Sequence, residues 1–169
     1  MAPFPAERRD LGLHQPSGAT LALEPFPRRE AERLGAAFAA IDPWARYPYP
    51  APQLAAYLAA HEPGAPRLAL YSGTTIAGAV GLRLEWLKGP YLQFLGIVPD
   101  FQGRGIGSAV LEWLEHEARA GGERNLWACA SDFNIGALVF YQRHGFERVA
   151  ALDGLVCDGR AEVLLRKRL

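Results

Sequence analysis

The stretch PDFQGRGIGSAVLEWLEHEA, residues 99–118, constrains the fold more than any other part of the sequence. Gly103, Gly105 and Gly107 alternate with other residues, and an amphipathic pattern at helical spacing follows from Ile106. This arrangement predicts a glycine-rich turn that opens a helix. The first N–H groups of a helix have no partner within it and lie at the positive end of its dipole, and glycine lets a ligand approach them closely. The stretch therefore predicts an anion-binding site.

Two well-known phosphate motifs do not fit this stretch. A P-loop ends in Gly-Lys-Ser/Thr, whereas this turn ends in Gly107-Ser108 without a lysine. A dinucleotide fingerprint reads Gly-x-Gly-x-x-Gly, and here the glycines follow Gly-x-Gly-x-Gly. A tight turn between a strand and a helix needs only one glycine, so three of them favour a ligand site. Arg104 adds a guanidinium that can meet a phosphate.

The composition is that of an ordinary globular protein in a reducing compartment. The 169 residues fit one domain, and 18 Lys and Arg balance 18 Asp and Glu, so no net charge attracts nucleic acid or an anionic membrane. No apolar run approaches the roughly 20 residues that span a bilayer. Cys129 and Cys157 lack the spacing of a metal site or a disulfide framework. We therefore expect a cytoplasmic protein with no metal and no nucleic-acid or membrane partner.

The remaining pattern predicts a mixed α/β domain. Residues 1–18 are rich in Pro, Arg and Gly without a period, which predicts a loose N-terminal leader and leaves residues 19–169 as a single domain. Residues 42–53 hold four prolines, which predicts a loop. The predicted elements are, in chain order, a strand at 19–26, helices at 28–41 and 51–61, strands at 67–73, 75–87 and 89–98, a helix at 106–120, a strand at 125–130, a helix at 134–144, and a final hairpin of 146–152 and 161–167.

Two segments of the chain resemble a known family. The segment FLGIVPDFQGRGIGSAVLEWL resembles the acetyl-CoA-binding motif of the GNAT superfamily of N-acetyltransferases, Gln/Arg-x-x-Gly-x-Gly/Ala after a strand, with Gln102, Gly105 and Gly107 at its fixed positions. The segment NLWACASDFNIGALVFYQRHGFERV is similar to the second motif of the family, a strand and an Asn followed by a Tyr seven residues later. Asn134 and Tyr141 match that motif, and Gly-Phe closes the helix.

The resemblance implies a fold and a cosubstrate. The fold is a mixed, mostly antiparallel central sheet of about six to seven strands flanked by about four helices, with one strand splayed open at the acetyl-CoA site. The pantetheine arm of acetyl-CoA would pair with the backbone of Leu95, Gly96 and Ile97. The splayed strand would account for Gly96, since glycine is unusual inside a strand. The other cofactor contacts that the resemblance implies are Gln102, Gly103, Arg104, Gly105, Ile106, Gly107, Ser108, Asn134 and Tyr141.

The second motif implies the chemistry. Acetyl transfer to an amine releases a thiolate that needs a proton, and the resemblance gives the proton transfer to Tyr141 and a hydrogen bond with the cofactor arm to Asn134. Each has a structural alternative, Tyr141 as a packed aromatic and Asn134 as a helix N-cap. Residues 91–98 and 125–130 contain no carboxylate, so Glu85 is the nearest candidate base. Glu85 could instead be only a solvated charge at the end of a strand. The amine proton would then pass to a base through water or directly to solvent.

The acceptor side is predicted from the same resemblance. In this fold the acceptor approaches over the segment between the first two strands, which brings Trp44, Tyr47 and Tyr49 to its entrance, with Glu85 as a further contact. Such rings suit an apolar or cationic amine, and they equally suit an apolar patch or a dimer contact. The leading hypothesis is direct acetyl transfer to a primary amine of a small molecule or a protein. The alternatives are an acyl-CoA-binding sensor without turnover and an acyltransferase with another acyl donor. A homodimer through the last hairpin also stays open.

Overall fold

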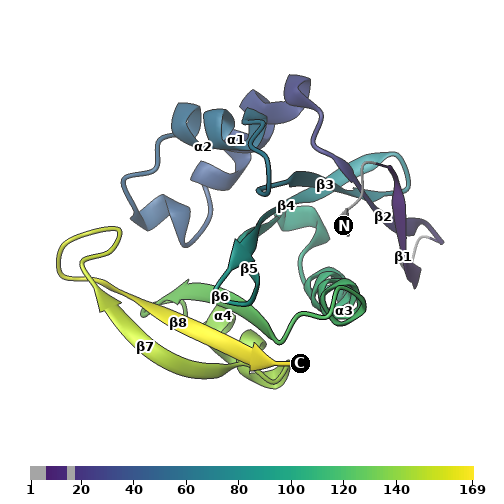
Figure 1. Ribbon diagram of the computed structural model, residues 1–169. Coiled ribbons are helices and arrows are strands. Elements are labelled where there is room, and N and C mark those ends of the chain that lie inside the picture. The colour runs from purple at the N-terminus through teal and green to yellow at the C-terminus, as the bar shows by residue number, and fades with distance from the viewer. Residues whose placement is uncertain (1–6, 15–17) are drawn as a thin grey trace.

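The computed structural model describes residues 7–14 and 18–169, which form one eight-stranded sheet with helices on both faces (Figure 1). The spatial order of the strands is β1-β2-β3-β4-β5-β6-β8-β7. The strands are β1 (Arg9–His14), β2 (Thr20–Pro25), β3 (Arg67–Ser72), β4 (Thr75–Trp86), β5 (Gly89–Ile97), β6 (Asn125–Ser131), β7 (Glu147–Asp153) and β8 (Ala161–Arg168). The α-helices are α1 (Ala31–Ala39), α2 (Ala51–Ala59), α3 (Ile106–Ala120) and α4 (Ile135–Arg143), and the short 3-10 helices are η1 (Arg28–Glu30), η2 (Trp44–Arg46) and η3 (Pro99–Phe101).

The sheet is mixed and mostly antiparallel, so the predicted fold class is confirmed. Only β5 and β6 run parallel among the strand pairs of the described residues, and each other neighbouring pair is antiparallel. The strands and helices predicted from residue 19 onward all form in the predicted order. The sheet has eight strands rather than six to seven because β1 adds one at its edge.

Part of the predicted N-terminal leader is a strand. Residues 9–14 form β1, which pairs with β2 in the antiparallel register Arg9↔Leu23 and His14↔Thr20. Leu11 and Leu13 alternate along β1 and pack against the main core, so the prediction of a loose segment is wrong for these residues. Residues 1–6 and 15–17 of the predicted leader lie outside the described residues.

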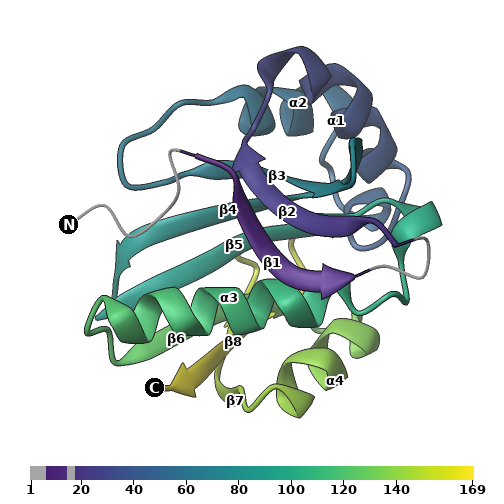
Figure 2. The ribbon, with the colours of Figure 1, turned by 90° about the vertical axis from the view of Figure 1, so that its right-hand side faces the viewer.

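The two faces of the sheet carry separate apolar cores because successive strand residues point to opposite sides. Leu68 and Leu70 of β3 belong to the core under α3, whereas Ala69 between them belongs to the core under α1 and α2. Figure 2 shows α3 and α4 together on one face, with α1 and α2 at the other side of the sheet. The buried positions of α3 include those that its periodicity predicts, Ile106, Val110, Trp113, Leu114 and Ala118. None of the helices in the described residues has both the length and the apolar composition to cross a membrane.

The predicted loop at 42–53 overlaps the predicted helix at 51–61, and the structure confirms the helix from Ala51, so residues 51–53 are helical. Its first part contains η2, and α2 begins at Ala51 inside the proline-rich stretch. Pro52 occupies the first turn of α2, where a missing N–H removes no intrahelical hydrogen bond. The connection between α1 and α2 is therefore compact and carries its aromatic side chains toward β5.

Candidate functional site

The strands β5 and β6 separate soon after they meet. They pair only at Tyr91↔Trp127 and Leu92↔Ala128. Beyond Leu92, β5 continues to pair with β4 as far as Ile97, while β6 pairs with β8 along its whole length. The edge of β5 that faces β6 is therefore unpaired over its last residues, which is the splayed strand that the family resemblance implies.

A cavity of about 520 Å³ lies where the two strands part. Residues 91–95 of β5 and 129–131 of β6 line its inner side, and α4, α2, the connection that contains η2, and the β7–β8 hairpin complete its walls. A cavity of this volume is large enough for a small ligand. The space between the separated ends of β5 and β6 is thus a cavity and is not filled by packed side chains.

The glycine-rich turn leads from β5 and η3 into α3. Gly103 and Gly105 adopt left-handed backbone angles, with φ of 72° and 76°, which favour glycine. Gly105 is the N-cap of α3 and offers no side chain to cap it. The first intrahelical bond runs from the Ala109 N–H to the Gly105 carbonyl, so the N–H groups of residues 106–108 have no helical partner. The predicted anion site is thus open at the N-terminus of a 15-residue helix.

Polar side chains of this turn bond to its own backbone. Gln102 Nε2 donates to the Ile97 carbonyl over 3.0 Å, and Arg104 Nη2 donates to the Asp100 carbonyl over 2.5 Å. The Arg104 guanidinium also lies over the Phe101 ring, 5.1 Å from its centroid. Both side chains hold the loop in this structure.

Two glycines at the site allow close packing. A Cβ on Gly96 would lie 2.7 Å from Phe38 Cε1 and 2.8 Å from Phe94 Cε1, and a Cβ on Gly107 would lie 3.0 Å from Phe140 Cζ. Gly96 is therefore required by two aromatic rings packed on β5, a reason that differs from the splayed strand expected from the sequence. Gly107 lets the start of α3 approach α4.

Ser108 connects the turn to the end of α4. Its Oγ lies 3.0 Å from His144 Nε2, and His144 Nδ1 lies 2.8 Å from the Phe140 carbonyl. Because a carbonyl only accepts, the Nδ1 N–H donates to it, and Nε2 forms a hydrogen bond with the Ser108 hydroxyl. Ile106 is 1% exposed, so it can contribute only its backbone to a ligand.

Tyr141 and Asn134 both line the cavity from α4. Tyr141 is 7% exposed, and its hydroxyl has no hydrogen-bond partner among residues 7–14 and 18–169. Burial, followed by the charge of a Cys129 thiolate, raises the pKa of Tyr141, so the phenol stays protonated. Asn134 is the N-cap that the sequence left as an alternative, because its Oδ1 accepts the Ala137 N–H over 3.2 Å. Its amide nitrogen has no partner among the described residues.

The family follows from a comparison with known proteins. The model of the acetyltransferase (GNAT) family matches residues 27–146, more than half of the chain. The chain belongs to this family. Both segments that resemble GNAT motifs, the glycine-rich turn and the strand and helix with Asn134 and Tyr141, lie within or at the end of this match.

Individual relatives agree with the GNAT assignment. The uncharacterized N-acetyltransferase YjhQ of Escherichia coli K12 is 31% identical over 86 residues, which are 50% of this chain and 41% of YjhQ, so the chain matches about two fifths of that relative. An acetyltransferase from Thermus thermophilus superposes with a TM-score of 0.70 at 25% identity, over 88% of this chain and 97% of the other. A GNAT family acetyltransferase from Elizabethkingia anophelis, solved with acetyl-CoA bound, has the same fold at a TM-score of 0.57 and 17% identity, over 63% and 77% of the chains.

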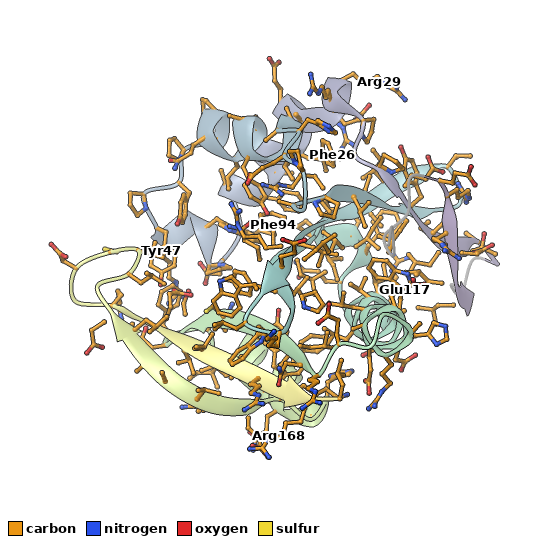
Figure 3. All side chains as sticks on the ribbon, in the orientation of Figure 1. Phe26, Arg29, Tyr47, Phe94, Glu117 and Arg168 are labelled. Atoms are coloured by element: carbon orange, nitrogen blue, oxygen red, sulfur yellow. The ribbon has the colours of Figure 1, made fainter. Side chains whose placement is uncertain are left out.

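The three aromatic residues predicted at the acceptor entrance of this GNAT chain all line the cavity. Trp44 also stacks on Phe94, so it belongs to the apolar core under α1 and α2 as well. Tyr47 and Tyr49 meet edge to face at 6.1 Å between ring centroids. Figure 3 shows Tyr47 on the side of this connection that faces the β7–β8 hairpin.

The carboxylate at the cavity is Glu162, which the sequence did not indicate. Glu162 lies in β8 opposite Ser131 of β6, and its Oε1 accepts the Tyr47 hydroxyl. It is the only acidic residue among those that line the cavity in the described part of the chain. Glu85, the candidate from the sequence, is exposed near the β4–β5 turn and does not line the cavity. No local signal distinguishes Glu162 from a solvated strand residue, because its partner Tyr47 lies 115 residues away.

Proposed function

We propose that this protein is an acetyl-CoA-dependent N-acetyltransferase in which Tyr141 protonates the leaving thiolate. One observation carries the proposal. Most of the Tyr141 side chain is buried, but its hydroxyl opens onto the cavity and has no hydrogen-bond partner among the described residues, so it is free to meet a ligand there. A bound ligand atom would supply that partner, and the thioester sulfur is the atom that needs a donor during acetyl transfer.

The anion site and the splayed strand support acetyl-CoA as the donor. The pyrophosphate suits the uncapped N–H groups of residues 106–108, and the pantetheine amides suit the unpaired edge of β5 near residues 95–97. The side chain of Gln102 already donates to the Ile97 carbonyl, so this carbonyl is not free to accept a hydrogen bond from the pantetheine arm. The acetyl end would then reach the cavity beside Tyr141.

The proposed step balances without a covalent enzyme intermediate. The lone pair of a neutral amine forms the C–N bond at the thioester carbonyl carbon, and the C–S bond breaks with its electron pair on sulfur. The Tyr141 proton passes to that sulfur, and the proton lost by the amine nitrogen restores the phenol through water. Because burial raises the pKa of Tyr141, the phenol is in the donor form across the neutral pH range.

The proposal is tested by CoA release. Wild-type protein with acetyl-CoA and a panel of primary amines should release free thiol, while Tyr141→Phe should lower kcat by about 100-fold. Acetyl-CoA should still bind Tyr141→Phe and, at 100 times its dissociation constant, raise Tm by about 5 to 10 °C. Tyr71→Phe is the matched control, because Tyr71 lies in β3 away from the cavity lining.

The alternatives give different results. Acetyl-CoA binding without thiol release from any amine would favour a sensor without turnover. Thiol release only with longer acyl-CoA thioesters would favour another acyl donor. A Tyr141→Phe enzyme with unchanged kcat would remove Tyr141 from the chemistry while leaving the family and the donor site in place.

A further inference from the structure

Glu162 is a buried carboxylate without a cation beside it. The residue is 8% exposed and lines the cavity. Only the Tyr47 hydroxyl donates to it, at Oε1, and no Lys, Arg or His of the described ranges forms an ion pair with it. A buried charge is costly unless it is paired. A cation that enters the cavity would supply the ion-pair partner that this carboxylate lacks.

Tyr47 orients Glu162 but does not neutralise it. Burial, and next the hydrogen bond to Glu162, raise the pKa of Tyr47 to about 12, so the phenol remains a neutral donor. Its ring is fixed by edge-to-face contacts with Tyr49 and Phe133, at centroid distances of 6.1 and 5.3 Å. The carboxylate is thus held in place with its negative charge available to a ligand.

The rest of the cavity lining is aromatic, aliphatic or neutral polar, and in the described residues it carries no positive charge. No Arg, Lys or His lines it among the described residues. The guanidinium groups of Arg46 and Arg160 lie over the Phe133 ring, and neither residue belongs to the lining. Aromatic faces favour cations and apolar groups, whereas an acid group on the ligand would meet Glu162 without a counter-charge. The aromatic lining residues are Trp44, Tyr47, Tyr49, Tyr57, Tyr91, Phe94 and Tyr141.

We propose that the acceptor is a small primary amine that enters as an ammonium ion on an apolar or aromatic body without an acid group, and that Glu162, held by Tyr47, binds this ammonium. The bound ammonium gives one proton to water, and the neutral amine that results is the nucleophile of the transfer step. The inference rests on the proposed function, since it names the substrate class of the same site. The cavity of about 520 Å³ must also admit the acetyl end of the donor, which favours a small molecule. An α-amino acid is excluded because its carboxylate would lie near Glu162.

The first test measures binding, so that it does not depend on turnover. Calorimetry on the full chain saturated with CoA compares 2-phenylethylamine with L-phenylalanine, and tryptamine with L-tryptophan. The members of each pair differ only by the carboxylate. We expect each amine to bind at least about 100-fold more tightly than its amino acid, because like charges brought together in a buried site repel strongly. L-Phenylalaninamide, which lacks the negative charge, should recover most of this difference.

Two variants locate the effect at Glu162. Glu162→Gln keeps the size and the hydrogen bond from Tyr47 but removes the charge, so the ratio within each pair should fall to less than about tenfold. Glu85→Gln, at the exposed carboxylate outside the cavity, should leave the ratio unchanged. If Glu162→Gln does not fold, as its Tm would show, Tyr47→Phe keeps the charge and should keep the preference for the amine.

Amine binding by calorimetry and thiol release, measured on the same protein, distinguish a failure of this inference from a failure of the proposed function. Amine binding with the expected preference but no thiol release would support the inference and refute the acetyltransferase activity. Efficient acetylation of the amino acids would support the activity and overturn the inference. The inference is also overturned if no amine binds more tightly than its amino acid, or if the wild-type chain and Glu162→Gln show the same ratio.

Discussion

The indole ring of Trp44 is stacked on the ring of Phe94, with 4.6 Å between ring centroids and 22° between the ring planes. Phe38 of α1 contacts both rings, at 5.6 Å from Trp44 and 5.2 Å from Phe94. The connection between α1 and α2 is thereby attached to β5 beside the point where β5 leaves β6. The wall of the cavity and the core under α1 and α2 share one aromatic cluster.

Trp44→Ala should therefore weaken acceptor binding and stability together. The loss of the stack and of a partly buried indole should cost about 1–3 kcal/mol, less than a fully buried Trp. The KM for an amine acceptor should rise about tenfold, because Tyr47 and Tyr49 lie in the same connection. Steady-state kinetics with each substrate varied in turn would show whether the KM for acetyl-CoA is unchanged.

Trp44→Phe is the control for this prediction. A phenyl ring can keep the contact with Phe94, so stability and the KM for the amine should stay close to wild type. An equal rise in both KM values in Trp44→Ala would instead point to general loosening of the fold.

The fold was largely predictable because its signals are local. The helix at 106–120 shows a continuous amphipathic period, and the turn at 73–74 between β3 and β4 carries ordinary hairpin chemistry. The splayed strand was predicted from resemblance to the GNAT motifs. β1 was missed because its only signal is the alternation of Leu11 and Leu13 in a stretch rich in charge and glycine.

The candidate site was predictable only in part, since several of its contacts join distant segments. The glycines and Tyr141 lie in motifs that the sequence displays directly. The pairing of Tyr47 with Glu162, in contrast, depends on how the α1–α2 connection meets β8. The reason for Gly96 also appears only in three dimensions, where Phe38 packs onto β5.

Gly96→Ala should destabilise the protein through overpacking. The added Cβ would lie 2.7 Å from Phe38 and 2.8 Å from Phe94, so both rings would have to move. A cost of about 1–3 kcal/mol is expected, seen as a lower Tm in thermal unfolding. Gly136→Ala is the matched control, because its Cβ would meet only Asn134 Oδ1 at 3.9 Å and alanine favours a helix. If both variants unfold at the same temperature, packing against Gly96 is not the constraint.

Gly105→Ala should weaken binding of the nucleotide part of acetyl-CoA. Gly105 has φ of 76° at the N-cap of α3, so alanine would strain or shift the turn that we propose to bind the pyrophosphate. We expect the dissociation constant for acetyl-CoA to rise about tenfold, or ~1.4 kcal/mol. Acetylpantetheine lacks the pyrophosphate and should bind Gly105→Ala as it binds wild type.

Gly122→Ala separates backbone strain from the loss of the anion site. Gly122 has the same φ of 76°, but it follows the C-terminal end of α3, and a Cβ there meets nothing within 4 Å. It should lose stability to a similar extent while binding acetyl-CoA normally. Equal weakening of acetyl-CoA and acetylpantetheine in Gly105→Ala would show that the turn does not bind phosphate.

Glu115 should make stability depend on pH in the acid range. Its burial raises the pKa, but hydrogen bonds and charges from Lys167 and Arg119 outweigh this, so the pKa of Glu115 lies below its usual value. A carboxyl with a lowered pKa in the folded state stabilises the protein above its unfolded pKa of about 4.3. That contribution is lost as the pH falls through the lower folded pKa. Glu115→Gln should thus cost about 0.5–1 kcal/mol near pH 7, since the group is three-quarters buried and its partners are partly exposed.

Urea unfolding of wild type and Glu115→Gln at several pH values would check this dependence. The difference in unfolding free energy should be constant between about pH 5 and 8 and should shrink below about pH 4.3. Glu112→Gln is the control on the same helix, because Glu112 is exposed and forms no ion pair with a described residue. Its stability should follow wild type at every pH. A difference for Glu115→Gln that persists undiminished at low pH would mean that packing, rather than the charge facing Lys167, supplies the stabilisation.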